Sequence, residues 1–443
     1  MRWYHDTNRG QWLALIAALL GWLFDGFEMG IFPAVARPAL IDVLGYRLQE
    51  MESTGQYFDA DGNPADSKKV QQLSGLWYGR ITAAFLVGAA LGGWIFGWIG
   101  DRLGRVRGLM LSVLTYSVFT GLCGLARSPW QLLALRFTAA LGMGGEWALG
   151  VALVMETWPS RARPVLAGLI GAAANIGFTL AALLAWSFDS LGLPIAQGGW
   201  RWVLGFCAFP ALLTFFIRMF VPESERWQQV AKTEAKPHLA EIFRPGIAFN
   251  TIIGSCLGAI ALIGTWGSIQ WIPPWVNSQT NSQFQTSLAQ ISSGLGACVF
   301  AFLGGFVGQT LGRRIGYFSI SLASLLLCAW IFRFPWTFSP TTPNWRFMCL
   351  VFLAGGVTAA FYGWLPLYLP ELFPTRLRAT GQGFAFNIGR IVAAFGAVFT
   401  GTLINEVFHG SYAQAGAITS LIYIAGLLIV WFAPETKGRP LPS

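Results

Sequence analysis

Long apolar runs separated by short polar segments dominate the chain. A helix that crosses the hydrocarbon of a bilayer needs about 20 consecutive, mostly apolar residues. Runs of that length predict twelve membrane-spanning helices, which we place at residues 12–36, 75–99, 107–126, 130–154, 164–187, 201–221, 248–272, 287–308, 315–333, 346–368, 379–404 and 413–433. Between the first two spans, residues 45–75 are polar and contain several Asp and Lys residues, which predicts an exposed loop.

The composition supports a protein that lies in a lipid bilayer. Only 11% of the 443 residues are charged and 54% are hydrophobic, whereas soluble domains are about 25% charged. The net charge of +9 falls mainly in short loops, without a basic stripe and interleaved aromatics, so no nucleic-acid partner is expected. The six cysteines stand singly inside apolar runs, which favours packing and predicts no metal or cofactor. The first span lacks a cleavage signal, so we expect it to remain as an anchor.

One loop sequence occurs twice. Residues 97–107 read GWIGDRLGRVR, in which glycines permit a tight turn and the charges disfavour hydrocarbon. Residues 305–314 read GFVGQTLGRR and repeat the glycines, Leu and Arg of the first copy at a constant offset of 208. A duplicated fold explains this spacing.

Two further pairs of motifs follow the same order in each half. The motif from Glu156 to Arg163 returns from Glu371 to Arg378 at offset 215, and Pro222-Glu-Ser returns as Pro434-Glu-Thr at offset 212. We therefore predict an all-α protein of two pseudo-symmetric halves, with a binding site near the bilayer midplane between them. The predicted parts are an N-terminal six-helix bundle at 1–221, a cytoplasmic linker at 222–247 and a C-terminal six-helix bundle at 248–443.

Basic residues predict the orientation in the membrane. If the spans alternate as predicted, eighteen Lys and Arg residues lie on the side that carries both termini and nine lie on the other side. The positive-inside rule then places both termini in the cytoplasm.

Together these motifs resemble the major facilitator superfamily over essentially the whole chain. Residues 97–106 are similar to the superfamily's signature between its second and third helices, and residues 434–438 are similar to the closing signature of its sugar-porter branch. Residues 136–147, 156–159 and 368–381 are similar to bacterial aromatic-acid/proton symporters, sialate transporters and the synaptic vesicle glycoprotein 2 group. The resemblance implies the twelve-helix major facilitator fold and secondary transport.

The chain differs from the family's pattern at two informative places. Aromatic-acid symporters carry Asp-Gly-x-Asp in the first helix, whereas this chain reads Asp25-Gly-Phe-Glu28 and so keeps both acids but lengthens the second. Gln309 stands in the second loop copy where the first copy has Asp101. A charge-based gate is therefore expected to operate fully only in the N-terminal half.

Three carboxylates inside the predicted spans are candidates for proton coupling. Asp25 and Glu28 lie three residues apart, on roughly one face of a helix. Neighbouring carboxylates in a span favour sharing a proton, because ionising both adds repulsion to an already costly burial. Glu146, deeper in its span, is the third candidate. The alternative is that these acids only neutralise a nearby cation or lie close to water.

Two arginines inside the spans are candidates for binding an anion. Arg136 is about 15 Å along its helix from Glu146 and so cannot pair with it. It either binds an anionic substrate or neutralises the acids of the first span. Arg390 follows Asn387 by three residues, and its guanidinium offers bidentate hydrogen bonds to a carboxylate. An internal salt bridge remains the alternative for both arginines.

The resemblance also implies residues that line a central cavity. In this fold the first, fourth, seventh and tenth helices surround the cavity, and we add one residue from the fifth. The candidates are Asn175, Trp266, Gln270 and Tyr362. Aromatic residues at this depth stack on a ring or a sugar face, although most aromatic residues in spans serve packing. The three histidines fall outside the predicted spans, so no histidine relay is expected.

The repeated loops and motifs predict an ion-pair gate at the cytoplasmic side. Ion pairs between helix ends hold one side shut and break when the halves rock. The residues are Asp101, Arg102, Arg105, Glu156, Arg161 and Arg163 in the first half and Glu371, Arg376 and Arg378 in the second. The alternative is that the arginines only fix the topology.

We therefore expect a secondary transporter that moves a small organic anion, such as an aromatic acid or a sugar acid, by proton symport and alternating access. Two arginines against three acids leave a sugar or organic-cation carrier, including a uniporter, as an alternative. A non-transporting ligand-binding receptor is a further alternative. An enzyme is disfavoured, because the sequence contains no catalytic metal spacing, nucleophile elbow or phosphate loop. We expect a monomer in a bacterial inner membrane.

Overall fold

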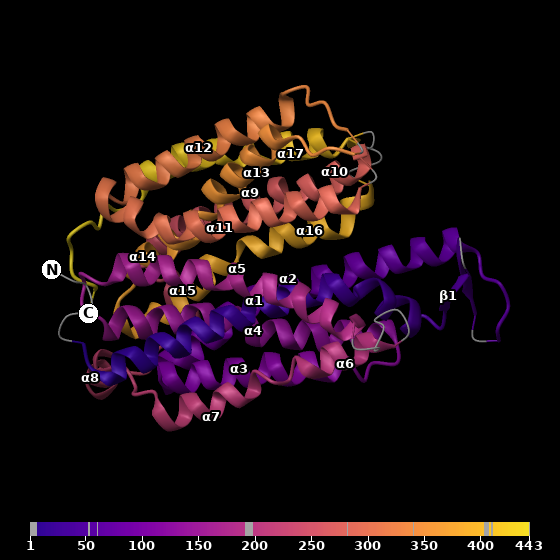
Figure 1. The fold of residues 1–443 in the computed structure, drawn as a ribbon. Helices are drawn as coiled ribbons and strands as arrows, with labels where there is room; N and C mark the ends of the chain where they lie inside the picture. The colour runs from indigo at the N-terminus through magenta and orange to yellow at the C-terminus, as the bar shows by residue number, and fades with distance from the viewer. Residues whose placement is uncertain are drawn as a thin grey trace.

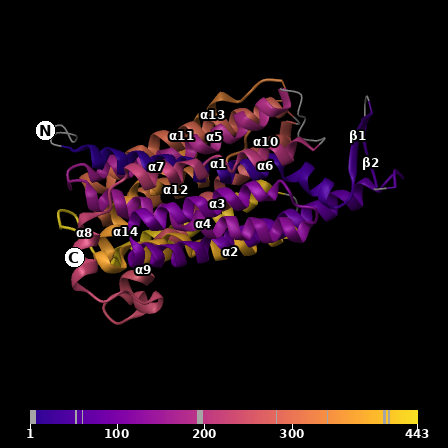
Figure 2. The same ribbon diagram turned by 90° about the horizontal axis from the view of Figure 1, so that it is seen from below.

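A computed structural model describes residues 7–51, 54–59, 61–190, 198–280, 282–339, 341–402, 407–408 and 411–442. Long helices run side by side and form an elongated bundle (Figure 1). We call the end that carries the turns at Gly104 and Gly312 the basic end, and the opposite end, which carries β1, the hairpin end. The start of the first helix and the C-terminus both lie at the basic end (Figures 1 and 2).

The helices before the linker form what we call the N-terminal bundle. They are α1 (Arg9–Val43), α2 (Ser67–Leu103), α3 (Arg105–Cys123), α4 (Pro129–Thr157), α5 (Arg163–Ser190), α6 (Gly199–Phe206) and α7 (Ala211–Phe220). Local sequence sets several of their starts. Asn8 and Gln11 form a capping box at the start of α1, and Ser128 caps α4, which has Pro129 in its first turn.

The helices after the linker form the C-terminal bundle. The linker contains α8 (Glu225–Thr233) and the 3₁₀ helix η2 (Leu239–Phe243). The bundle consists of α9 (Ala248–Ser268), η3 (Ile269–Trp271), α10 (Ile272–Thr280), α11 (Gln283–Leu311), α12 (Arg313–Arg333), α13 (Trp345–Ala359), α14 (Phe361–Leu372), η4 (Thr375–Leu377), α15 (Arg378–Asn387), α16 (Gly389–Thr402), α17 (Tyr412–Thr419), α18 (Ile422–Ile429) and η6 (Val430–Phe432).

Ten segments within the described ranges are long and apolar enough to cross a membrane. The predicted spans 201–221 and 379–404 are each divided into two shorter helices, α6 with α7 and α15 with α16. The first division lies before Pro210, which has no N–H to continue a helical ladder. The second division lies at Ile388, beside Gly389. The arrangement confirms the predicted all-α membrane fold.

The segment between α1 and α2 corrects the predicted loop at 45–75. It contains an antiparallel hairpin of β1 (Arg47–Met51) and β2 (Thr54–Phe58), which projects beyond the helix ends (Figure 2). Tyr57 of this hairpin is buried against α1 and α2, and its hydroxyl accepts a hydrogen bond from Arg37 at 2.8 Å. α2 also begins earlier than predicted, because Asp66 caps it by accepting from the Lys68 N–H at 2.9 Å.

The two bundles meet closely through glycines. A side chain at Gly93 of α2 would overlap Asn387 and the backbone of α15, and one at Gly383 would overlap the backbone of α2. A second contact of the same type joins α5 and α11. A side chain at Gly168 of α5 would overlap the backbone of α11, and one at Gly305 of α11 would overlap the backbone of α5. The absence of a Cβ lets the helices of one bundle touch those of the other along two seams.

Candidate functional site

Five charged side chains lie inside the bundle, far from its ends along the helices. Asp25 and Glu28 come from α1, Arg136 and Glu146 from α4, and Arg390 from α16. Their exposed fractions run from 0% to 4%. An unpaired charge at such depth is costly, so each of these groups needs a partner, a proton or a ligand.

Glu28 and Arg136 form a buried ion pair between α1 and α4. Thr120 of α3 also donates to Glu28 Oε1 at 3.1 Å. The Arg136 guanidinium carbon lies 4.5 Å from the ring centroids of both Phe32 and Phe85. Of the two predicted roles for Arg136, this conformation shows the neutralisation of an acid of the first span, with aromatic rings beside the cation.

Asp25 and Glu146 have no such partner. In the described part of the chain, neither oxygen of either carboxylate has a partner within hydrogen-bond distance. The Glu146 carboxylate lies against α1, where a side chain at Gly21 would collide with it. Asp25 lies within electrostatic reach of Glu28, Glu146 and Arg390. Asp25 therefore interacts both with other acids of its own bundle and with the cation of the C-terminal bundle.

Arg390 lies in the first turn of α16, directly after the interruption at Ile388. Its Nε and Nη1 atoms are buried and have no hydrogen-bond partner. Asp25 of the other bundle and Tyr362 of α14 lie within electrostatic range of this guanidinium. A buried guanidinium with unused donors is suited to bind an anion.

Asn387 sits on the other side of the same interruption and reaches across the bundle interface. Its Nδ2 donates to the carbonyl oxygens of Gly144 in α4 and Gly383 in its own helix, both at 3.0 Å. Its Oδ1 is buried without a partner. The amide thus fastens α15 to α4 and leaves an acceptor near the centre.

An aromatic cluster joins the two bundles beside these charges. Phe386 of α15 stacks on Trp147 of α4 with centroids 3.9 Å apart, and meets Trp22 edge to face at 6.2 Å. Tyr362 packs against the same Phe386 ring at 6.4 Å. The Trp22 N–H and the Tyr362 hydroxyl have no hydrogen-bond partner. Sequence reasoning missed Trp22, although it precedes Asp25 by three residues and shares its helix face.

The other predicted lining residues lie farther from the charged centre or are only partly engaged. Asn175 donates to the Gly171 carbonyl of its own helix at 3.3 Å. Trp266 is 37% exposed and lies near the Tyr362 hydroxyl. Gln270 is exposed and belongs to η3, where the seventh predicted span changes from α9 to α10. Within the described ranges no group of three His, Cys, Asp or Glu residues could hold a metal ion.

At the basic end, Asp101 of α2 binds the start of α15 in the other bundle. It accepts hydrogen bonds from the backbone N–H groups of Ala379 at 3.1 Å and Thr380 at 2.7 Å, and from the Thr380 hydroxyl at 2.5 Å. Asp101 is thus a helix cap supplied across the bundle interface. Arg105 contacts Asp101 at 2.5 Å and donates to the Thr375 carbonyl of the C-terminal bundle at 2.6 Å.

Glu156 contacts Arg105 and also forms an ion pair with a residue of the other bundle. It lies 2.9 Å from Arg105 and 2.7 Å from Arg378 of α15, and the Ser224 hydroxyl donates to it at 2.6 Å. All three charged residues are fully buried at their side chains. These contacts hold the two bundles together at the basic end.

The copy of this network in the second half stays within its own bundle in the contacts observed. Arg313 pairs with Glu371 at 2.6 Å and donates to Gln309 at 3.2 Å. Thr436 donates to Glu371 at 2.5 Å. Gln309 is exposed and so lacks the position that Asp101 holds against the other bundle.

The remaining predicted gate residues have different surroundings. Arg163 donates to the Met155 carbonyl at 3.2 Å, and Arg102 lies over the Trp98 ring at 5.2 Å. Arg161 is exposed in the turn before α5. Arg376 forms ion pairs with Glu241 and Glu234 of the linker.

The linker crosses both bundles at the basic end. Trp94 and Trp98 of α2 donate their ring N–H groups to linker carbonyls, each at 3.0 Å. Phe243 of η2 lies edge to face with Trp94 of the N-terminal bundle, at 6.1 Å, and with Phe384 of the C-terminal bundle, at 5.2 Å. Together with Arg376, these contacts tie the linker to both sides of the seam between α2 and α15.

Two glutamates that were not among the predicted site residues cap the helices after the repeated loops. Glu223 accepts from the N–H groups of Arg105 and Val106 at the start of α3, and Glu435 accepts from those of Arg313 and Arg314 at the start of α12. Burial raises the pKa of Glu223 despite these bonds. Burial also acts to raise the pKa of Glu435, but its backbone hydrogen bonds prevail and lower it. The repeated Pro-Glu after each bundle was the available signal.

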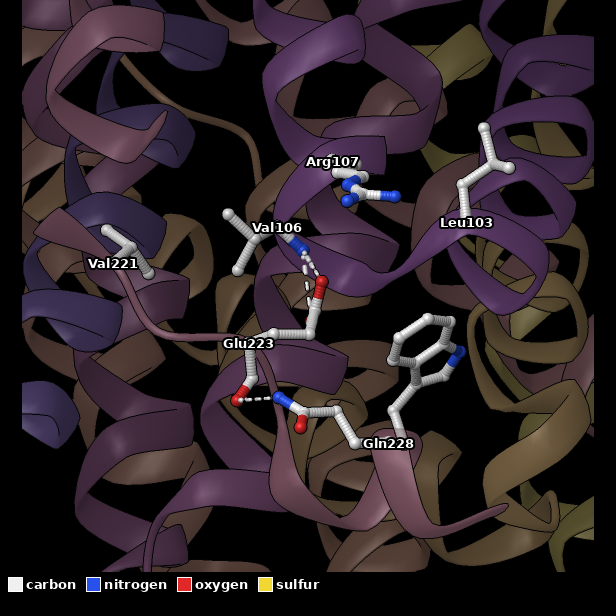
Figure 3. A pocket seen from close by; sticks show the side chains of 7 residues that line it. Leu103, Val106, Arg107, Val221, Glu223 and Gln228 are labelled. Atoms are coloured by element: carbon white, nitrogen blue, oxygen red, sulfur yellow. Dashed lines mark hydrogen bonds between the residues drawn. The ribbon is translucent and has the colours of Figure 1, made fainter. Parts of the chain in front are cut away.

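Glu223 also lines a pocket at the outer edge of the basic end (Figure 3). The pocket has a volume of about 310 Å³ and is lined by Leu103, Val106, Arg107, Val221, Glu223, Trp227 and Gln228. The Glu223 carboxylate turns toward the Val106 N–H, and Gln228 donates to the Glu223 carbonyl at 3.5 Å (Figure 3). Trp227 donates to the Asp101 carbonyl at 2.9 Å, so this pocket borders the gate and lies away from the buried charges.

The fold and its buried charges define a multi-pass membrane transporter rather than an enzyme. The family model described as "Sugar (and other) transporter" matches residues 13–245, and the model described as "Major Facilitator Superfamily" matches residues 255–443. The chain belongs to the major facilitator superfamily, as the sequence motifs predicted.

Similar proteins span nearly the full chain. The probable 4-methylmuconolactone transporter of Cupriavidus pinatubonensis is 29% identical, over 98% of this chain and 93% of that protein. The cis,cis-muconate transport protein of Acinetobacter baylyi is 29% identical, over 84% of this chain and 88% of that protein. Among solved structures, the proton:xylose symporter XylE matches with a TM-score of 0.73 and 18% identity, over 98% of both chains, which shows a shared fold.

Proposed function

We propose that this protein is a proton-coupled symporter of a small organic anion, with the anion's carboxylate bound at Arg390. The observation that carries the proposal is the buried Arg390 guanidinium, which has two nitrogens without a partner among the described residues and lies within electrostatic range of the likewise unpartnered Asp25 carboxylate. The similarity to muconate and muconolactone transporters supports a carboxylate or its lactone as the cargo.

The geometry gives a simple coupling rule. Ionised Asp25 neutralises Arg390 and competes with any substrate carboxylate for it. When Asp25 takes up a proton, Arg390 loses its counter-ion. Its affinity for the substrate anion then rises, because an uncompensated buried charge is costly. Proton and anion therefore enter the site together and leave it together. Glu28 and Glu146 are the further proton-coupling residues in this proposal, and Tyr362, Trp266, Asn387, Asn175 and Gln270 complete the substrate site with the Glu28-paired Arg136.

The basic end supplies the gate of this proposed cycle. In this proposal the Asp101 cap, the ion pair of Glu156 with Arg378 and the glycine seams are the contacts that keep that end shut. Access from the basic side requires these contacts to break as the bundles rock. We place both termini, and thus the basic end, in the cytoplasm of a bacterial cell, since eighteen of the Lys and Arg residues lie on that side. A single chain contains both bundles and so suffices as a monomer.

Uptake into proteoliposomes tests the proposal. Purified protein is reconstituted and offered labelled benzoate, cis,cis-muconate, N-acetylneuraminate, xylose or choline, with and without an imposed proton gradient. We expect at least one carboxylate to accumulate only with the gradient, and xylose and choline to be ignored. Accumulation of xylose or choline instead, uptake of a carboxylate that does not respond to the gradient, or binding of a carboxylate without any flux would each overturn the proposed function.

A further inference from the structure

α3 carries a row of buried hydroxyl groups that faces the carboxylates of α1 and α4. Tyr116, Ser117 and Thr120 are at most 1% exposed. Among the residues that the structure describes, the Tyr116 and Ser117 hydroxyls have no partner within hydrogen-bond distance, whereas Thr120 donates to Glu28 at 3.1 Å. A buried hydroxyl without a partner destabilises the folded chain, because nothing replaces the hydrogen bonds that it made to water. Two adjacent residues of α3 carry such hydroxyls.

The two ends of this row lie beside different carboxylates. Tyr116 packs against α4 four residues before Glu146, since an added Cβ at Gly142 would lie 2.6 Å from the Tyr116 backbone nitrogen. It also lies within electrostatic range of Glu146, Asp25 and Glu28. At the other end, Thr120 is bonded to Glu28, whose second oxygen Oε2 is buried without a partner. Glu28 in turn holds Arg136. The hydroxyls of α3 therefore extend from the unpaired acids Glu146 and Asp25 to the paired acid Glu28.

The second half of the chain lacks this arrangement. The loop offset of 208 matches Tyr116 and Thr120 of α3 with Ser324 and Cys328 of α12, and both are fully buried. Cys328 contacts the Ser268 hydroxyl at 3.8 Å. The predicted spans after residue 248 contain no Asp or Glu at all. Within the predicted spans, hydroxyls next to carboxylates are thus a property of the N-terminal bundle, because the spans of the C-terminal bundle contain no carboxylate side chain.

We propose that Tyr116, Ser117 and Thr120 form a hydroxyl relay that carries the proton between Glu146 and Glu28. In one passage, protonated Glu146 gives its hydrogen to the Tyr116 oxygen, each hydroxyl passes its own hydrogen to the next, and Thr120 gives its hydrogen to Glu28. Every hydroxyl is neutral before and after, Glu146 ends ionised and Glu28 ends protonated. The protonated Glu28 then releases Arg136. This inference rests on the proposed proton symport.

The test compares two kinds of transport in proteoliposomes that contain the full chain. The probe is whichever of benzoate, cis,cis-muconate and N-acetylneuraminate the wild type accumulates. Gradient-driven accumulation requires net proton transfer, whereas counterflow exchanges labelled for unlabelled probe and does not. We expect Tyr116→Phe to lower the initial rate of gradient-driven uptake at least about tenfold, since a positioned proton-transfer group contributes about 10²–10⁴-fold. We expect its counterflow to remain.

Three further variants make the result decisive. Tyr317→Phe is the matched control, because the Tyr317 hydroxyl is buried in the C-terminal bundle and donates to the Leu257 carbonyl at 2.8 Å. It should leave both kinds of transport unchanged. Thr120→Val should repeat the Tyr116→Phe defect and Thr120→Ser should restore uptake. A larger slowing of uptake in D₂O is expected for Tyr116→Phe than for wild type, because proton transfer then limits the rate.

The outcomes separate this proposal from the proposed function. If the wild type accumulates no panel carboxylate under a gradient, the symport proposal fails and the relay fails with it. If the wild type accumulates the probe and both Tyr116→Phe and Thr120→Val do so equally well, the relay alone is wrong. A parallel loss of uptake and counterflow in both variants, with no change in the D₂O effect, would also overturn it, since that pattern indicates a structural role.

Discussion

Arg136 and Arg390 are the same residue type at similar depth, but the structure surrounds them differently. Arg136 is paired with Glu28, lies beside two aromatic rings and has one nitrogen without a partner, whereas Arg390 has no ion pair among the described residues and two nitrogens without partners. A buried cation that already has a counter-ion gains little from a ligand, and one with unused donors gains much. This contrast favours Arg390 as the anion site.

Arg390→Lys should abolish most of the transport while retaining the charge. A lysine ammonium cannot reproduce the planar fork that binds a carboxylate in two places. We expect the rate of carboxylate uptake to fall at least about tenfold, in line with about 1.5–3 kcal/mol for hydrogen bonds to charged groups. Arg333→Lys, at the last residue of α12, is the matched control and should transport normally. Normal carboxylate uptake by the Arg390 variant would rule out a bidentate site.

Glu28→Gln should lower the free energy of unfolding strongly, because the substitution leaves the buried Arg136 without its counter-ion. Removing one partner of a buried ion pair leaves the other uncompensated and costs about 3–5 kcal/mol. The double variant Glu28→Gln with Arg136→Gln should recover a large part of this loss. Thermal unfolding in detergent gives the comparison. Equal losses that simply add in the double variant would show that the two residues do not depend on each other.

At the scale of elements, the two repeated loops have diverged in what they bind. The first loop places Asp101 on the N-terminus of α15 in the other bundle, and the second has Gln309, which accepts from Arg313 of its own bundle. The contacts of the two repeated loops are therefore asymmetric. One seam is closed by a charged helix cap, while the seam between α5 and α11 relies on glycine-to-backbone contact.

Asp101→Ala should loosen the start of α15. Loss of a helix cap costs about 1–2 kcal/mol, which corresponds to roughly a tenfold change in local opening. Hydrogen exchange measured by mass spectrometry should show faster exchange of the Ala379 and Thr380 amides. Both amides donate hydrogen bonds to Asp101 in the structure. Gln309→Ala should leave the exchange of these two amides as in the wild type. Unchanged exchange in the Asp101 variant would mean that the cap does not hold this end.

The presence and order of these elements could be predicted from the sequence. The contacts that they make with one another could not. The offset of the loops predicted the duplicated bundles, and the in-span charges marked Asp25, Glu28 and Arg390 as candidates. Nothing in the pattern showed that Asp101 binds Thr380, because that contact joins residues 279 positions apart. The hairpin after α1 was missed because its strands lie in a polar stretch without the alternation that predicts a strand.

At the scale of the molecule, the bundles touch through two seams that exclude side chains. A glycine in a helix costs about 1 kcal/mol relative to alanine, so a substitution to alanine stabilises where space allows. Gly294 of α11 has no atom within 4 Å of an added Cβ, whereas an added Cβ at Gly168 of α5 would overlap the Phe302 carbonyl. The same change therefore has opposite effects at the two positions.

Gly168→Ala should impair transport, and Gly294→Ala should not. Overpacking costs about 1–3 kcal/mol, which exceeds the gain in helix propensity at Gly168 and holds α5 away from α11. We expect slower counterflow for Gly168→Ala, with wild-type counterflow and a slightly raised Tm for Gly294→Ala. Equal counterflow in both variants would indicate that the seam tolerates a methyl group and that its closeness is not needed for the cycle.

The break at Ile388 divides one predicted membrane crossing into two helices, α15 and α16, which make different contacts. α15 is fastened to the opposite bundle by Asp101 and Asn387, while α16 carries Arg390. If Arg390 binds the cargo as proposed, ligand binding acts on α16 while Asp101 and Asn387 hold α15 against the opposite bundle. Occupancy of the site would then come before release of the held segment, so that the two sides of the membrane open in turn and never together.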